Sequence, residues 1–241
     1  MEQTLKGILI HTIRYNDNQL IVRVFTSKFG LKSFLVRSGK TQKSSKINLL
    51  QPLSLIEFEA VLKEQSRIHP LKNLSSAHPW QSIPYDVSKS AIVLFLNEVI
   101  YKTIPDDYIN EPLFQLLWDA LILLDDTMDA KNFHIWCLLE ITRHYGFYPQ
   151  CEEEVKYFDM GLGCFVDRLP AHKDFMDAEE SIVMHEMLDK EWPEVQDLLL
   201  SGDLRKRVLM SLVRYIRIHL ESLREIKSLE VLHEVFHDDS I

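Results

Sequence analysis

The spacing of apolar residues changes from strand-like to helix-like near residue 80, and this change constrains the fold more than any other feature of the chain. Before it, runs rich in Ile, Val and Phe are separated by turn residues, as in NQLIVRVFT and LSLIEFEAVL; such runs are typical of β-strands. After it, apolar residues recur every three to four positions, which is the spacing of one helix face. We therefore predict a multidomain α+β chain, with strands in residues 1–80 and helices in residues 81–241.

Five strands are expected in the first domain, at residues 5–14, 18–26, 31–37, 53–62 and 65–74. Segments with turn chemistry separate them, among them YNDN and SGK. Five short strands in about 75 residues suit a small closed barrel, and the five-stranded OB-fold is one common form of it. The first domain is therefore predicted to be an OB-fold β-barrel, a fold that binds oligonucleotides across one face and through two loops.

The second domain is predicted to be all-helical, with one irregular insertion. The expected helices are residues 86–104, 112–126, 131–145, 178–190, 193–200, 204–223 and 228–237. Gly146 is expected to cap the third of these helices, because glycine readily adopts the left-handed backbone that ends many helices. The segment of about residues 150–174 loses the helical spacing and contains the tract MGLGCFV, so a small hairpin is expected between two helices.

Charge is divided between the two predicted domains. Residues 1–80 contain 12 basic and 5 acidic residues, a net charge of +7, and residues 81–241 have a net charge of −16, which together give the −9 of the chain. Six cations lie within residues 28–46, where there is no acidic residue: Lys28, Lys32, Arg37, Lys40, Lys43 and Lys46. Such a cluster attracts polyanions. It can equally be a solvated loop that only aids solubility, and charge alone leaves both interpretations open.

The motifs of common catalytic and metal sites are missing from the sequence. Neither G-x-G-x-x-G nor G-x-x-x-x-G-K-[ST] occurs among its 7 glycines, and HEMLD at residues 185–189 lacks the second His of a zinc-protease helix. His134 and Cys137 are three residues apart on an expected helix, where such pairs are usually core packing. The acidic pair Asp106–Asp107 is interpreted as a solvated helix end. We therefore predict no catalytic residue, no bound metal and no cofactor.

The chain has 3 cysteines, Cys137, Cys151 and Cys164, whose irregular spacing gives no disulfide framework, so a reducing compartment is expected. Cys151 and Cys164 bracket the predicted hairpin. A structural zinc site usually has four ligands in two close pairs, whereas each of these cysteines stands alone. No apolar stretch reaches the roughly 18 residues of a membrane helix, and the N-terminal sequence lacks the pattern of a signal peptide.

The expected helix at residues 204–223 has two distinct faces. Its apolar stripe is predicted to be buried: Leu204, Val208, Leu212, Ile216 and Leu220. Arg207, Arg214 and Arg217 share another face of the helix. This basic face is either solvated, with local ion pairs to Glu221 and Asp203, or a contact for an acidic peptide, and the spacing leaves both interpretations open.

Several segments, in this order, match one protein family: KGILIHTIRYNDNQLIVRVFTSKFGLKSFLVRSGK, LLQPLSLIEFEA, FHIWCLLEITRHYGFYPQC and REIKSLEVLHEVF. Over essentially its whole length the chain resembles the RecO family of DNA repair and recombination mediators. The resemblance implies an N-terminal OB-fold and a helical C-terminal domain, in many members with a four-cysteine zinc hairpin inserted between helices. Here Cys151 matches one ligand position and Cys164 roughly another, while the partner cysteines are missing.

The resemblance also implies a function. Members of the family bind single- and double-stranded DNA, anneal complementary strands, and work with RecR to load RecA onto DNA coated by single-strand binding protein, whose acidic C-terminal tail they contact. They are not enzymes, and a cytoplasmic, nucleoid-associated protein is expected. A scaffold whose basic loop binds no nucleic acid, and a hydrolase that uses the acidic clusters with a divalent ion, are the competing interpretations.

Site residues follow from this expectation. The six cations of residues 28–46 are predicted to contact DNA phosphates, which they can do without reading base sequence. Tyr15, Phe29 and Phe34 are candidates to stack on bases, although each is also a plausible core residue of the barrel. The face of Arg207, Arg214 and Arg217 is a candidate contact for the acidic tail.

Overall fold

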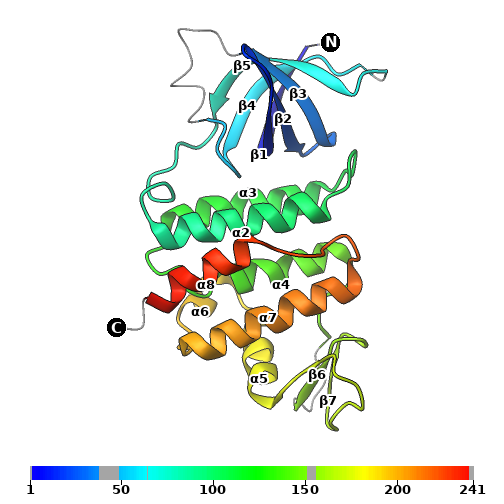
Figure 1. Cartoon of the computed structure of the whole chain (residues 1–241), viewed down its shortest axis with the longest axis vertical. Helices are drawn as coiled ribbons and strands as arrows, with labels where there is room; N and C mark the ends of the chain where they lie inside the picture. The colour runs from blue at the N-terminus through cyan, green and yellow to red at the C-terminus, as the bar shows by residue number, and fades with distance from the viewer. Residues whose placement is uncertain (1, 38–48, 64, 151–155, 239–241) are drawn as a thin grey trace. The chain divides into compact units, whose positions relative to one another are not determined.

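The computed structural model describes residues 2–37, 49–63, 65–150 and 156–238 (Figure 1). The chain divides into two compact units, the first made of Met1–Tyr85 with Asn97–Asp126 and the second of Asp86–Leu96 with Thr127–Ile241. The division into domains of residues 1–80 and 81–241 stays a prediction.

A closed five-stranded barrel begins the first unit (Figure 1). Its strands are β1 (Gln3–Asn16), β2 (Gln19–Thr26), β3 (Gly30–Arg37), β4 (Leu55–Ala60) and β5 (Ile68–Ser76). They pair in the order β1-β2-β3-β5-β4, and β4 closes on β1. Among the described pairs, β3 with β5 is parallel and meets only over Ser33–Leu35 and Ile68–Pro70. The predicted OB-fold is therefore confirmed.

Alternating apolar residues fill the barrel. Phe34 and Phe58 meet edge to face, with 4.8 Å between ring centroids, and Val22 and Val24 belong to the same buried cluster. Successive residues of a strand point to opposite faces, so an apolar residue at every second position lines the interior. This period of two gives the strands an apolar face, and these faces enclose the core of the barrel.

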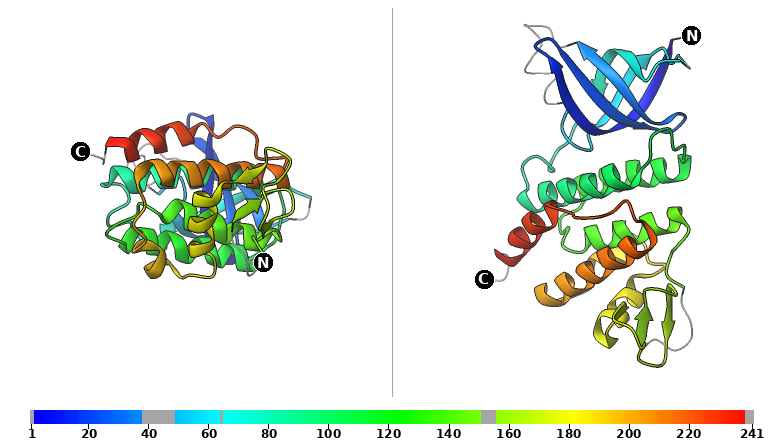
Figure 2. Two further views of the ribbon diagram at one scale, coloured as in Figure 1. Left: turned by 90° about the horizontal axis from the view of Figure 1, so that it is seen from below. Right: turned by 45° about the vertical axis from the view of Figure 1, so that its right-hand side comes forward.

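Helix α3 (Glu111–Asp126) and the last turns of α2 (Val87–Thr103) complete the first unit. Helix α3 runs across one end of the barrel (Figure 2), where its side chains meet residues of β1 and β2. Phe25 contacts Phe114 edge-on at 5.7 Å between centroids, and the Lys6 ammonium lies 5.6 Å from the centre of the Trp118 ring. OB-folds bind oligonucleotides on the face of strands 2 and 3. Here Phe25 of β2 is buried against α3 of the same unit.

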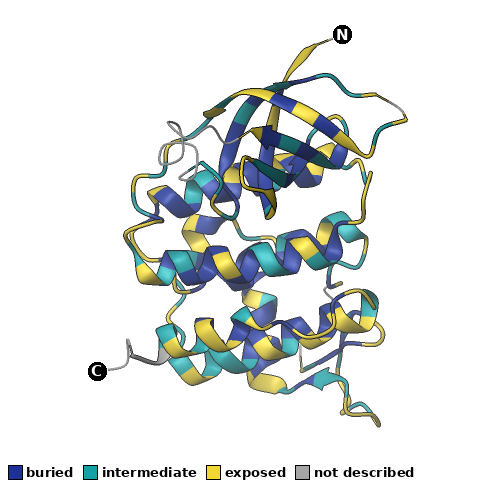
Figure 3. Cartoon of the chain, turned by 45° about the horizontal axis from the view of Figure 1, so that its top comes forward, coloured by how far each residue is buried: buried dark blue, intermediate teal, exposed yellow. Residues whose placement is uncertain are grey.

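The second unit is an assembly of helices with alternating buried and exposed patches (Figure 3). Besides the first turns of α2 it contains α4 (Phe133–Tyr145), α5 (Ala178–Met187), α6 (Trp192–Gln196), α7 (Gly202–His219) and α8 (Ser228–Asp238). Gly146 ends α4 with a left-handed φ of 83°, as predicted. Each helix expected from the sequence is present, and the predicted all-helical domain is confirmed.

Three of the helices are shorter than the apolar spacing predicts. Helix α5 ends at Met187, and Asp189 beyond it has a φ of 57°. The Asp189 carboxylate pairs with the Arg143 guanidinium of α4 at 3.0 Å. Helices α6 and α7 end at Gln196 and His219, each four residues earlier than predicted. The spacing of apolar residues alone does not report these helix ends.

The insertion between α4 and α5 is a small three-stranded sheet. Strand β6 (Tyr157–Asp159) is central and pairs with β7 (Cys164–Val166) and β8 (Phe175–Met176). The predicted hairpin is β6 with β7, whereas β8 was not predicted because two residues show no alternation. Cys151 lies outside the described residues. Within the part of the chain that is described, no group of three His, Cys, Asp or Glu side chains is placed to hold a metal ion.

Candidate nucleic-acid interface

Three of the six predicted phosphate contacts lie in the described structure. Lys28 is exposed in the turn between β2 and β3, and Arg37 is exposed at the end of β3. Lys32, near the start of β3, is half-buried. The other three residues fall outside the described residues: Lys40, Lys43 and Lys46. The described cations thus mark both ends of β3, the strand that the basic segment was predicted to form.

Two barrel cations are engaged by the loop between α2 and α3. The Lys32 ammonium pairs with the Asp107 carboxylate at 2.5 Å. The Arg23 guanidinium pairs with Asp106 and lies 5.3 Å from the centre of the Tyr101 ring. The two acidic residues were interpreted as a solvated helix end, yet each contacts a cation of the barrel. Sequence reasoning missed Arg23, because it lies outside the basic segment.

The three aromatic candidates differ in their access to solvent. Tyr15 is 63% exposed at the end of β1, so a base can reach its ring. Phe29 is partly buried against the barrel core. Phe34 is 0% exposed. Of the two interpretations left open for Phe34, base stacking and core packing, its burial supports core packing, because its ring fills the barrel interior.

Two grooves flank the short parallel contact of β3 with β5. The larger has a volume of about 750 Å³ and includes Lys32, Lys63 and Arg67 in its lining. The smaller has a volume of about 320 Å³ and includes Arg37 and Lys72. The two strands pair over so few residues that they separate on either side of the contact, which opens both grooves. Each groove therefore carries cations contributed by two strands or loops that are distant in sequence.

Lys63, Arg67 and Lys72 were not singled out from the sequence. They follow the acidic stretch of Glu57 and Glu59, so no basic run is visible there. They come close to the basic segment only because β5 pairs with β3. The sequence signal that could have found them is the net charge of +7 over the whole of residues 1–80, rather than within one segment.

His69 lies in the larger groove and is 3% exposed. Burial lowers the pKa of His69 below its usual value of 6.5, the Lys32 charge lowers it further, and the Asp107 charge opposes the shift. Its Nδ1 accepts the Lys63 N–H at 3.4 Å. The imidazole is therefore neutral at pH 7, and the positive charge of this groove comes from its lysines and arginine.

Comparison with known proteins identifies the family of the chain. A family model described as recombination protein O N terminal matches residues 1–80, and one described as recombination protein O C terminal matches residues 84–230. The chain is 36% identical to the DNA repair protein RecO of Phocaeicola vulgatus, over 98% of this chain and 100% of that protein. The chain belongs to the RecO family. The DNA repair proteins RecO of Flavobacterium johnsoniae and Flavobacterium psychrophilum are 36% and 37% identical to it, again over 98% of this chain and 100% of each relative.

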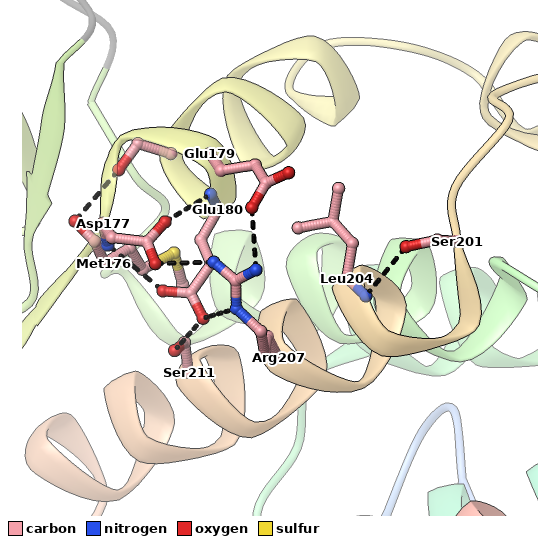
Figure 4. A network of polar contacts seen from close by, with 9 residues as sticks. Met176, Asp177, Glu179, Glu180, Ser201, Leu204, Arg207 and Ser211 are labelled. Carbon is pink, nitrogen blue, oxygen red and sulfur yellow. Dashed lines mark hydrogen bonds and ion pairs between the residues drawn. The ribbon is translucent and has the colours of Figure 1, made fainter.

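The α7 arginines of this RecO-family chain have different surroundings. Arg207 contacts the carboxylates of Asp177 at 2.6 Å and Glu179 at 2.7 Å, both at the start of α5 (Figure 4). Hydrogen bonds to these two carboxylates raise the pKa of the Arg207 guanidinium. Arg214 pairs with Asp174 at 2.6 Å, and Arg217 is exposed. These ion pairs join α7 to the start of α5 and to the insertion. Among the described residues, the local pairs with Glu221 and Asp203 that the sequence allowed are not the ones that form.

The pair of His134 and Cys137 on α4 is packed in the core of the helical unit. Burial lowers the pKa of His134 to about 3 and raises the pKa of the Cys137 thiol to about 12. At neutral pH the imidazole is uncharged and the thiol is protonated, so the pair offers no thiolate nucleophile. The predicted core role of this pair agrees with its burial. Over the described residues, no helix combines the length and apolar character needed to cross a membrane.

Proposed function

We propose that this RecO-family protein binds single- and double-stranded DNA, anneals complementary strands, and helps RecR to load RecA onto DNA coated by single-strand binding protein. Family matches that together span most of the chain support this proposal, and the single structural observation that carries it is the cationic, grooved β3–β5 side of the barrel. The protein acts without breaking covalent bonds, as a non-enzymatic mediator in the cytoplasm, associated with the nucleoid.

Annealing requires affinity for phosphates and tolerance of any base sequence. Lysine and arginine supply the first through release of counterions, and they do not read bases. Exposed Lys28 and Arg37 mark the two ends of β3, and the basic segment continues beyond Arg37 in the sequence. An exposed aromatic ring such as that of Tyr15 supplies the second requirement, because every base has a face on which it can stack.

The helical part of the chain is proposed to bind the protein partners. Residues 81–241 have a net charge of −16, which disfavours contact with DNA phosphates. Arg214 and Arg217 are exposed on α7 and are the proposed contacts for the acidic tail of single-strand binding protein. Arg207 belongs to the same face, and its charge is shared with two carboxylates, Asp177 and Glu179, so it contributes less. Arg214 pairs with one carboxylate, that of Asp174, which the acidic tail would have to displace.

Annealing of complementary oligonucleotides coated with single-strand binding protein tests the proposal. Reversing Lys28 and Arg37 together to Glu should slow annealing about tenfold or more, because two phosphate contacts are lost on each strand. The matched control reverses Lys131 and Arg168, which are exposed and lie outside the barrel. If all six cations of residues 28–46 engage a single strand, log K should fall with log salt with a slope of about −4.

The second candidate function is a protein-interaction scaffold that binds no nucleic acid. The observation that favours it is the engagement of Lys32 and Arg23 by Asp107 and Asp106, which removes two cations from the open surface. A gel shift with single- and double-stranded DNA at moderate salt separates the two functions. Absence of any shift, or annealing that is equal in the barrel variant and its control, would favour the scaffold.

A further inference from the structure

The loop of residues 105–110 between α2 and α3, called the strap here, lies against the start of β3 (Figure 1). The Asp107 N–H donates to the Leu31 carbonyl at 3.2 Å, and Asp106 forms an isolated parallel bridge with Leu31. Gly30 beside it has a φ of 66°, and a Cβ at this position would come within 2.3 Å of the Tyr108 carbonyl oxygen. A glycine at the start of β3 is thus required for the strap to approach this closely.

The strap places two carboxylates outside two barrel cations. The side chains of Asp106 and Asp107 are 78% and 71% exposed, whereas those of Arg23 and Lys32 are 21% and 27% exposed. Asp107 also lines the larger groove, in which Lys63 and Arg67 are exposed. An anion that approaches Lys32 from solvent therefore meets the carboxylate of Asp107 first.

A carboxylate and a phosphodiester compete for the same ammonium group. The Lys32–Asp107 pair is partly open to water, and such pairs contribute little to stability, so they exchange partners readily. Asp107 is held at a φ of 62°, an uncommon conformation for a residue other than glycine. The strap thus holds its acidic side chain in place through backbone geometry, and the ion pair itself is easily replaced.

We propose that the larger groove binds the phosphodiester backbone of a single nucleic-acid strand, and that Asp107 of the strap opposes this binding through its ion pair with Lys32. This inference rests on the proposed function and adds a regulatory contact to it. Lys63 and Arg67 bind the backbone in the groove, and Lys32 joins them when phosphate displaces the Asp107 carboxylate. The strap therefore weakens binding of a short or isolated strand until enough phosphates compete with it.

Replacing Asp107 by Asn tests the inference with a fluorescently labelled thymidine oligonucleotide, whose binding is followed by anisotropy in the full chain. Asparagine tolerates a positive φ, so the strap should keep its course, which an unchanged melting temperature would verify. One more neutralised phosphate should steepen the slope of log K against log salt by about 0.7 and tighten binding about fivefold at about 0.1 M salt.

Two further variants make the test specific. Asp119→Asn removes the same charge from an exposed site on α3 in the same unit and should leave affinity unchanged. Lys32→Gln in the Asp107→Asn background should abolish the gain, since the gain depends on the ammonium. An equal gain in Asp119→Asn, or a gain that persists without Lys32, overturns the inference while leaving DNA binding intact. Failure of the unmodified protein to bind the oligonucleotide overturns the proposed function and the inference together.

Discussion

At the scale of single residues, Asp125 shows how a buried charge can organise a connection. Its side chain is 0% exposed, and it accepts backbone N–H groups from Gln81 and Ser82 at 2.8 Å each and from Ile83 at 2.9 Å. Burial alone would raise the pKa of Asp125, but these hydrogen bonds outweigh it and lower the pKa below 3.8. The carboxylate therefore fixes the segment that leads from the barrel into α2.

Replacing Asp125 by Asn should lower the free energy of unfolding at pH 7 by about 1–3 kcal/mol, because the backbone N–H groups of residues 81–83 lose a charged acceptor. A carboxylate whose pKa is lower in the folded state stabilises the fold above its unfolded pKa, and this stability is lost as the pH falls through the folded pKa. The free energy of unfolding, measured by urea denaturation, should therefore differ most between Asp125→Asn and the unmodified protein at pH 7. This difference should shrink as the pH falls below about 4.

The neighbouring exposed residue provides the control for this prediction. Asp126→Asn removes the same charge one position along α3, where the side chain is in solvent. Its stability should stay within about 0.5 kcal/mol of the unmodified protein. Equal stability of the two variants at pH 7 would show that the hydrogen bonds of Asp125 contribute nothing net.

Individual residues also mark the limit of sequence reasoning. Gly146 was predictable as a helix cap because its role depends only on its own helix. The Lys32–Asp107 pair was not, since 75 positions separate its partners. Phe34 was ambiguous for a third reason, because an aromatic residue in a strand can face the core or the solvent. Here its ring contacts the ring of Phe58 inside the barrel.

At the scale of elements, the insertion sheet contains a polar centre at Asp159. The Asp159 side chain accepts the N–H groups of Gly161 at 2.9 Å and Leu162 at 3.0 Å, and its other oxygen lies 2.9 Å from His172 Nε2. These contacts fix the turn between β6 and β7 and tie it to the segment before β8. Within the described residues, the turn is thus held by a carboxylate and a histidine of the chain itself.

Two measurements test this account of the insertion. Asp159→Ala should lower the free energy of unfolding by about 1–3 kcal/mol, because two N–H groups in the turn lose their acceptor. Asp167→Ala, at an exposed site of the same insertion, should have little effect. A chelator should leave the melting temperature of the unmodified protein unchanged, and elemental analysis should find no stoichiometric zinc. A fall in melting temperature with chelator would contradict this and would indicate a metal that involves residues such as Cys164.

Elements were predictable where one face is apolar and local spacing suffices. The barrel strands and the helices were found because their periods of two and of three to four residues reflect burial on one side. The closure of β3 on β5, which opens the two grooves, was not predictable in detail, because its register depends on a pairing between distant strands. The candidate site was consequently predicted as one basic segment, while the structure adds cations from the β4–β5 loop and β5.

At the scale of the whole molecule, the division of charge suggests that different parts of the chain meet different partners. A net charge of +7 in residues 1–80 and of −16 in residues 81–241 produces fields of opposite sign. Charge composition predicted this division without any knowledge of the fold. What composition could not show is that cations of α7, such as Arg207, are partly neutralised by acidic residues of α5.

If DNA and the acidic tail bind to separate surfaces, variants of each surface should weaken one binding activity and leave the other unchanged. Reversing Arg214 and Arg217 to Glu should weaken binding of a labelled acidic tail peptide of single-strand binding protein about tenfold or more, because two attractive contacts become repulsive. The same variant should bind a bare oligonucleotide like the unmodified protein. Reversing Lys28 and Arg37 should do the opposite, since a change in the barrel alters phosphate contacts and leaves the helical surface as it was. Peptide binding that survives the α7 reversals would reject α7 as the contact for the acidic tail. DNA binding that is lost with these reversals would mean that one surface binds both partners, so that the division of charge does not separate them.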